Sequence, residues 1–240
     1  MRIVIATGNP HKVEEMRRIF ADPSLRLAPL ALEFVGLSDL PGAPFPEPHE
    51  SGATFEQNAT IKALSYAEAS GEICLADDSG LEIDAIDGRP GVISSHYCTD
   101  GEERGMGRAE RDRRNIDRVL AEMAGVSAPA RRARFVCVMV LARPQEVLIR
   151  VRGTFEGRIG FPANAAREAA ADNAAPVPRG GNGFGYDPIF LLPSPDTRTS
   201  AELSPQEKDA RSHRGAAAGL MAARLRQLFD RRGVPNSPPG

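Results

Sequence analysis

The sequence predicts an α/β protein in which helices flank a mixed β-sheet. Strand-like and helix-like segments alternate from the first residues onward, which is the pattern that α/β folds produce. The 240-residue chain shows no internal repeat, and its hydrophobic content of 41% is typical of a globular domain with an ample core. We therefore expect one domain over residues 1–232, with a surface insertion at 163–179 and a disordered tail at 233–240.

Hydrophobic periodicity places the individual elements. Short continuous or alternating apolar runs predict strands, whereas apolar residues three and four positions apart predict amphipathic helices. Ser204, followed by Pro205 and Glu207, has the pattern of a helix N-terminus with a capping box. Strands are expected at residues 2–6, 72–76, 81–86, 135–142 and 147–155, and the main helices at 11–20, 54–69, 102–123 and 212–228.

Composition excludes several classes of protein. With a net charge of −2, the chain has no global positive field that would hold long nucleic acid. No run approaches the ~20 apolar residues that a membrane-spanning helix needs, and we expect no signal peptide. Three cysteines, an odd number, do not suit a disulfide framework. We expect a cytoplasmic protein that acts on a small molecule.

The segment 181–188, with the sequence Gly-Asn-Gly-Phe-Gly-Tyr-Asp-Pro, is the strongest functional signal. Its interleaved glycines allow sharp bends and close approach of a ligand. Its two aromatic rings offer flat faces that suit a heterocyclic base. Downstream, Lys208, His213 and Arg214 can donate hydrogen bonds to anionic oxygens. Taken alone, His213 would be an incidental polar residue, but together these residues predict a nucleotide pocket.

The turn after the first predicted strand, Thr7-Gly8-Asn9-Pro10-His11-Lys12, is a second candidate. Backbone donors at a helix N-terminus, joined by a lysine, form an anion site. The glycine spacing fits neither a P-loop nor a dinucleotide fingerprint. The alternative interpretation is an ordinary strand-to-helix turn with a surface lysine.

Asp77 and Asp78 stand side by side at the end of a predicted strand. Adjacent carboxylates repel unless a cation or donors compensate, and Mg²⁺ takes one or two carboxylates together with waters and substrate phosphates. Because side chains alternate along a strand, one aspartate should face the site while the other braces the turn. Glu50 is the candidate for a second metal ligand. The alternatives are a solvated turn for the pair, a favourable charge at a helix start for Glu50, and a solvated surface position for Lys62.

Four segments, taken in their order, make the chain resemble the inosine/xanthosine triphosphate pyrophosphatase family. Each segment is weak alone, but the combination is specific and spans nearly the whole chain, from residue 2 to about 228. The segments are residues 6–9 with Lys12; residues 52–55 with 58–59; residues 76–81; and residues 183–190 with 201–202, Lys208 and 212–214.

The resemblance implies a fold and a reaction. Members of the family hydrolyse deaminated purine triphosphates such as ITP, dITP and XTP to the monophosphate and pyrophosphate with Mg²⁺. They work as homodimers on an elongated mixed sheet, with the active-site cleft between two lobes. In this chain Asp78 would hold the metal, with Glu50, and activate the attacking water. The implied substrate contacts are Thr7, Gly8, Asn9, Pro10, His11, Lys12, Ser79, Phe184, Gly185, Tyr186, Asp187, Lys208, His213 and Arg214.

The chain departs from the family pattern at three places. His11 stands where a small or basic residue is more usual. His49-Glu50 presents one acid where two are often found, which weakens the case for a second metal ligand. The stretch 163–179 is longer than the family needs.

Two other functions remain open. One is a pyrophosphatase with another nucleotide preference, such as modified pyrimidines, which product analysis over several triphosphates would reveal. The other is a nucleotide sensor that binds without cleaving. The aspartate pair favours catalysis, because a pure binder has little use for it.

Overall fold

The computed structural model of the protein describes residues 1–172 and 174–230, which form two compact units. The predicted tail at 233–240 lies outside the described residues. Unit 1 contains Met1–Asp78, Cys137–Gly153 and the chain from Arg214 onward, and unit 2 contains Ser79–Val136 and Thr154–His213.

The sheet confirms the predicted mixed α/β class. Within the described residues it has six strands in the order β2-β1-β3-β4-β5-β6. β1 pairs in parallel with β2 and with β3, whereas β5 and β6 are antiparallel, so the sheet is mixed. The strands are β1 (Arg2–Ile5), β2 (Glu33–Gly36), β3 (Cys74–Ile83), β4 (Arg132–Arg143), β5 (Glu146–Ile159) and β6 (Phe190–Leu191).

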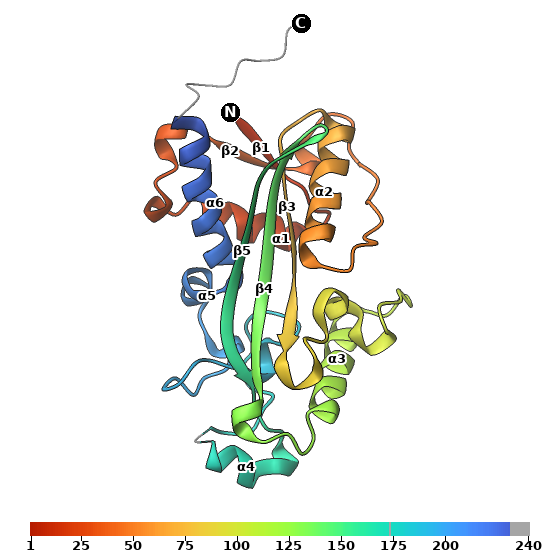
Figure 1. The fold of residues 1–240 in the computed structure, drawn as a ribbon, viewed down its shortest axis with the longest axis vertical. Helices are drawn as coiled ribbons and strands as arrows, with labels where there is room; N and C mark the ends of the chain where they lie inside the picture. Colours follow the sequence, from red (N-terminus) through yellow and green to blue (C-terminus); the bar gives the residue numbers. More distant parts are fainter. Residues whose placement is uncertain (173, 231–240) are drawn as a thin grey trace, which may run out of the picture. The chain divides into compact units, whose positions relative to one another are not determined.

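Local capping signals explain where two helices begin. Thr54 precedes α2 and its hydroxyl accepts a hydrogen bond from the amide of Gln57 at 3.2 Å. Ser204 caps α5 in the same way, as predicted. In the described chain, no helix is long and apolar enough to cross a bilayer. The α-helices are α1 (Pro10–Phe20), α2 (Phe55–Ser70), α3 (Arg108–Glu122), α4 (Ala166–Ala171), α5 (Pro205–Arg211) and α6 (His213–Asp230), as Figure 1 shows.

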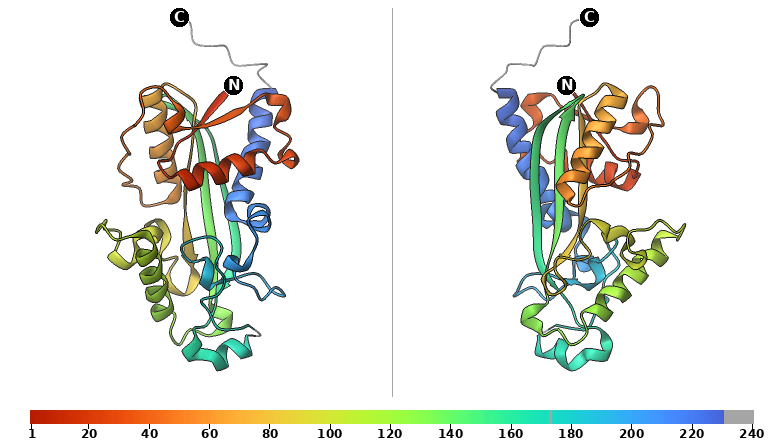
Figure 2. Two further views of the ribbon diagram at one scale, coloured as in Figure 1. Left: turned by 180° about the vertical axis from the view of Figure 1, so that it is seen from behind. Right: turned by 45° about the vertical axis from the view of Figure 1, so that its right-hand side comes forward.

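The core of unit 1 places helices on both sides of its strands. Ile3 and Met139 pack in one cluster with Met16 of α1 and Met221 of α6. The buried Ala63 belongs to α2, which lies on the opposite side of β3, β4 and β5 from α6 (Figures 1 and 2). Because side chains alternate along a strand, successive residues of β3 point toward different helices.

Unit 2 has its own apolar core. Leu81 of β3, Phe135 of β4, Phe190 of β6 and Val119 of α3 belong to it. The helix α3 also packs on a 3₁₀ segment, Gly91–Thr99. The helix α3 and this 3₁₀ segment thus form a packed support for the loops of unit 2.

The structure corrects two predicted boundaries. β3 is one continuous strand over Cys74–Ile83, where two strands separated by an acidic turn were expected. β3 lies between β1 and β4 in the sheet, and Lys12 and Lys62 compensate its two adjacent acids. α3 begins at Arg108 and not at residue 102, after Gly105, whose φ of +64° is outside the helical region.

The stretch 163–179, predicted as a surface insertion, contains the short helix α4. Ala169 in that helix is buried, and Val177 belongs to the core of unit 2. Parts of the stretch are therefore packed within unit 2. Alanine-rich sequence carries little apolar periodicity, although alanine favours helix.

Candidate active site

Asp77 is the centre of a buried ion cluster in unit 1. Its side chain is 1% exposed, and its carboxylate contacts the Lys12 amine at 3.1 Å and the Arg214 guanidinium at 3.3 Å. Arg214, at the start of α6, also pairs with Glu15 of α1 at 3.0 Å. The cluster joins the ends of two helices to β3. Arg214, which was predicted to contact substrate, is itself buried and lies against Asp77 through these contacts.

Asp78 lies toward α2, so the predicted divergence of the two aspartates is confirmed. Its Oδ1 accepts from the Lys62 amine at 2.9 Å. The same amine donates to Oε2 of Glu50 at 2.9 Å. The Oδ2 atom of Asp78 is buried and, within the part of the chain that the structure describes, has no hydrogen-bond partner. A buried carboxylate oxygen without a partner is costly, and it is the kind of atom that a metal ion or a water molecule satisfies.

The two aspartates have opposite pKa shifts. Burial raises the pKa of Asp78, and the nearby Lys62 offsets this only in part. Burial also acts to raise the pKa of Asp77, but the charges of Lys12 and Arg214 outweigh it and hold that pKa below its ordinary value. Burial lowers the pKa of Lys62, yet the charges of Asp78 and Asp77 raise it above its usual range. Asp77 thus stays charged to a lower pH than an ordinary aspartate, and Asp78 has the perturbed pKa typical of functional acids and bases.

The turn between β1 and α1 has the geometry of an anion site. The Thr7 hydroxyl accepts from the amide of Asn9 at 3.2 Å, and Pro10 begins the helix. Among the described residues, a Cβ on Gly8 would meet nothing within 4 Å. Lys12 lies in the first turn of α1. The side chain of His11 lies outside the described residues.

The glycine-rich loop in unit 2 places a ring and a charge pair together. Phe184 is 41% exposed, which is unusual for so large an apolar side chain. Asp187 is buried; its Oδ2 accepts from the amide of Phe184 at 2.8 Å, and its Oδ1 accepts from the Ser200 hydroxyl at 2.8 Å. The Lys208 amine pairs with the same carboxylate. A Cβ on Gly183 would collide with Asp187 and Lys208, so only glycine fits there.

Tyr186 does not offer its ring as predicted. It is 4% exposed, belongs to the core of unit 2, and donates its hydroxyl to the carbonyl of Ser94 at 2.7 Å. It therefore anchors the loop, and Phe184 presents the exposed ring. His213 is also buried, with its ring stacked on Phe135 at a centroid distance of 5.2 Å. Ser79 is half-buried on β3.

The sequence interpretation missed Lys62. It was taken for solvated surface, yet its side chain is 11% exposed and bridges two carboxylates. A compositional signal was available, since only three of the chain's 30 basic residues are lysines. All three lysines pair with aspartates: Lys12 and Lys62 with the adjacent aspartates of unit 1, and Lys208 with Asp187 of unit 2.

Known proteins are similar to this chain in sequence and in fold. The model of the Ham1 family matches residues 3–224. A dITP/XTP pyrophosphatase of Exiguobacterium sp. strain AT1b is 41% identical over 225 residues, covering 94% of this chain and 97% of that protein. A Ham1 protein structure from Staphylococcus aureus has a TM-score of 0.72 at 34% identity, covering 95% of this chain and 100% of that one. A HAM1 protein structure from Coxiella burnetii has a TM-score of 0.73 at 35% identity, covering 95% and 99%.

Proposed function

The chain belongs to the Ham1 family, and from that premise we propose that it hydrolyses deaminated purine nucleoside triphosphates. The substrates are dITP, XTP and ITP, and the products are the nucleoside monophosphate and pyrophosphate. Relatives about 40% identical over nearly their full length carry the name dITP/XTP pyrophosphatase. The reaction removes these nucleotides from the cellular pool.

The observation that carries the proposal is the state of Asp78. Its Oδ1 is held by Lys62, while its buried Oδ2 has no hydrogen-bond partner among the described residues. We propose that Oδ2 is the proton acceptor, oriented by a cation that favours the ionised form. Asp78 Oδ2 receives the proton of the attacking water. Lys12, oriented by Asp77, donates to the phosphate oxygens and stabilises their developing charge.

The charge balance around the aspartates fits a bound magnesium ion. Among the described residues, the ion pairs of this cluster join three basic side chains to four carboxylates. A triphosphate approaching such a cluster needs further positive charge. We propose that Asp78 and Glu50, which share the Lys62 amine, hold Mg²⁺ with the substrate phosphates as further ligands. The ion would supply positive charge and lower the pKa of a bound water.

The base is selected by hydrogen-bond polarity at the glycine-rich loop. Phe184 supplies the stacking face, and Lys208 supplies a donor close to it, with its amine 5.4 Å from the ring centroid. Hypoxanthine and xanthine present a 6-keto acceptor, whereas adenine presents an amino donor. Two donors facing each other in a buried site cost about 1–3 kcal/mol, so adenine is disfavoured.

Pyrophosphate release tests the proposal. ITP, dITP and XTP are compared with ATP, GTP, dTTP and UTP, each with and without Mg²⁺. We expect turnover of the first three in the presence of Mg²⁺ and little turnover of ATP. Faster turnover of dTTP or UTP than of ITP would replace the purine assignment, and binding of ITP without any cleavage would identify a sensor.

We also propose that the chain works as a homodimer in the cytoplasm. This rests on the resemblance to the inosine/xanthosine triphosphate pyrophosphatase family. Light scattering of the purified protein at several concentrations tests the assembly, and a monomer at all of them would reject it.

A further inference from the structure

The first turns of α3 hold the glycine-rich loop, although they are not part of it. The amide of Gly185 donates to Oδ2 of Asp112 at 3.1 Å. The Arg108 guanidinium lies over the Phe184 ring, with its carbon 4.7 Å from the ring centroid. Arg108 and Asp112 face the same side of the helix as an i,i+4 pair, 4.0 Å apart. One helix face therefore contacts both the backbone and the ring of the loop.

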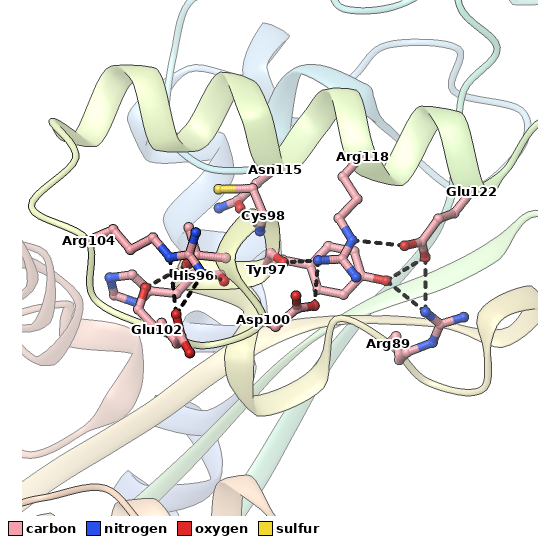
Figure 3. Close-up of polar contacts among 11 residues, drawn as sticks. Arg89, His96, Tyr97, Cys98, Asp100, Glu102, Arg104, Asn115, Arg118 and Glu122 are labelled. Carbon is pink, nitrogen blue, oxygen red and sulfur yellow. Dashed lines mark hydrogen bonds and ion pairs between the residues drawn. The ribbon is translucent and has the colours of Figure 1, made fainter.

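This helix is itself fixed on the 3₁₀ segment Gly91–Thr99. The buried side chain of Asn115 accepts from the amide of Cys98 at 2.7 Å and donates to the carbonyl of Ser95 at 3.0 Å. Arg118 and Glu122 extend these contacts along the helix, as Figure 3 shows. The loop is attached to the same segment through the Tyr186 hydroxyl. It is thus fastened on both sides of Gly185 to one rigid support.

The loop needs such a support, because its own sequence does not define one shape. Gly183 and Gly185 have φ values of +83° and +60°, in the left-handed region that glycine enters most easily. Glycine also loses the most conformational entropy on ordering. Phe184 between them is exposed, so core packing does not hold its ring.

We propose that Asp112 is a positioning residue for purine recognition. It holds the Gly185 amide and so sets the angle at which Phe184 meets the base; it does not touch the substrate. This inference rests on the proposed function, since it concerns the base side of the same reaction. Loss of the Asp112 contact should therefore weaken binding of the purine and leave the phosphate chemistry unchanged.

The test compares Asp112→Ala with Asp112→Asn. Alanine removes the acceptor, whereas asparagine keeps an oxygen that accepts from Gly185. We expect Asp112→Ala to raise KM for ITP about tenfold, with kcat within about twofold, because one ordering hydrogen bond is lost. Asp112→Asn should restore KM to within about threefold. Asp117→Ala, an exposed acid on the same helix, is the matched control and should leave both constants unchanged.

Product inhibition separates positioning from a general structural role. Inosine monophosphate carries the base, and pyrophosphate does not. In Asp112→Ala, the inhibition constant of inosine monophosphate should rise about tenfold while that of pyrophosphate stays the same. Asp112→Ser, which shortens the side chain but keeps it polar, should show the same split if alanine lowers the melting temperature.

The outcomes distinguish a failure of the proposed function from a failure of the role proposed for Asp112. If the wild-type protein releases no pyrophosphate from ITP, dITP or XTP, the proposed function fails. If it does, and Asp112→Ala keeps the wild-type KM and inhibition by inosine monophosphate, only the positioning role fails. Equal weakening of both products in the alanine and serine variants would also overturn it.

Discussion

The polar clusters of the two units bury their charges to a similar degree but differ in what lies beside those charges. In unit 1, Asp77, Asp78 and Lys62 are nearly buried and bound by several partners. In unit 2, the Asp187 and Lys208 pair sits beside an exposed ring on a loop rich in glycine. Buried pairs fix geometry to within a narrow range, which chemistry requires. A loop braced from outside suits recognition, where the ligand completes the packing.

The largest effect is expected at Asp78, whose proposed role is in the chemical step and not in recognition of the base. Asp78→Asn removes the proton acceptor and the negative charge, so kcat for ITP should fall about a thousandfold or more. The fold should be largely preserved, because the amide can still accept from Lys62. Pyrophosphate release measures the rate, and a melting curve measures the fold. A variant that keeps the wild-type rate with Mg²⁺ would remove Asp78 from the mechanism.

Asp77 should show the opposite balance, with stability affected most. Asp77→Asn leaves Arg214 and Lys12 with a neutral partner in a buried site, which costs roughly 3–5 kcal/mol of unfolding free energy. Urea denaturation measures this loss. Glu102→Gln breaks an exposed ion pair with Arg104 and should leave stability unchanged. Equal stability of the two variants would show that burial of the cluster does not matter.

Phe184→Ala tests the exposed ring of unit 2. Base stacking on an aromatic ring contributes about 1–3 kcal/mol, so KM for ITP should rise about tenfold or more. Stability should change little, because Phe184 is 41% exposed and does not belong to the core of unit 2. Phe184→Tyr keeps the stacking face and is the matched control. A tyrosine variant as poor as the alanine variant would argue against stacking.

The smallest expected effect concerns acidic pH, where activity should be lost at a higher pH than the folded structure. Because burial raises the pKa of Asp78 in the metal-free protein, protons should begin to compete with Mg²⁺ at a pH above the ordinary carboxyl value of 3.8, and turnover should fall with the loss of the ion. The pKa of Asp77 is lowered, so its contribution to stability is present above 3.8 and is lost only as the pH falls through the lower value of the folded state. Activity should therefore disappear while the fold persists. Rate and circular dichroism profiles that fall together would contradict this order.

Local features were predictable from sequence, and contacts between distant residues were not. The opening strand, turn and helix follow from neighbouring residues, and alternation along β3 predicts that Asp77 and Asp78 diverge. From the sequence alone, Lys62 would be assigned to the exposed surface of a helix. It is buried only because α2 is placed against β3. Asp112 is 73 residues from the amide it accepts, and no spacing rule connects the two.

The sequence also does not distinguish which aromatic ring of the glycine-rich loop is exposed, because packing decides this. The sequence marks both rings of the glycine-rich loop as candidate base contacts. In the structure, Tyr186 fills the core of unit 2 and Phe184 is left outside. Tyr186 packs in one cluster with Phe190 of β6 and reaches the 3₁₀ segment through its hydroxyl, and no local pattern specifies this placement.

The scarcity of lysine has a practical consequence for chemical labelling. Amines elsewhere on a protein usually swamp the signal from a binding pocket when acylating reagents are used. Here the side-chain amines are those of Lys12, Lys62 and Lys208. Lys62 is kept protonated and so is a poor nucleophile. Mass spectrometry of the acylated protein would thus report occupancy through two residues, without any engineered tag.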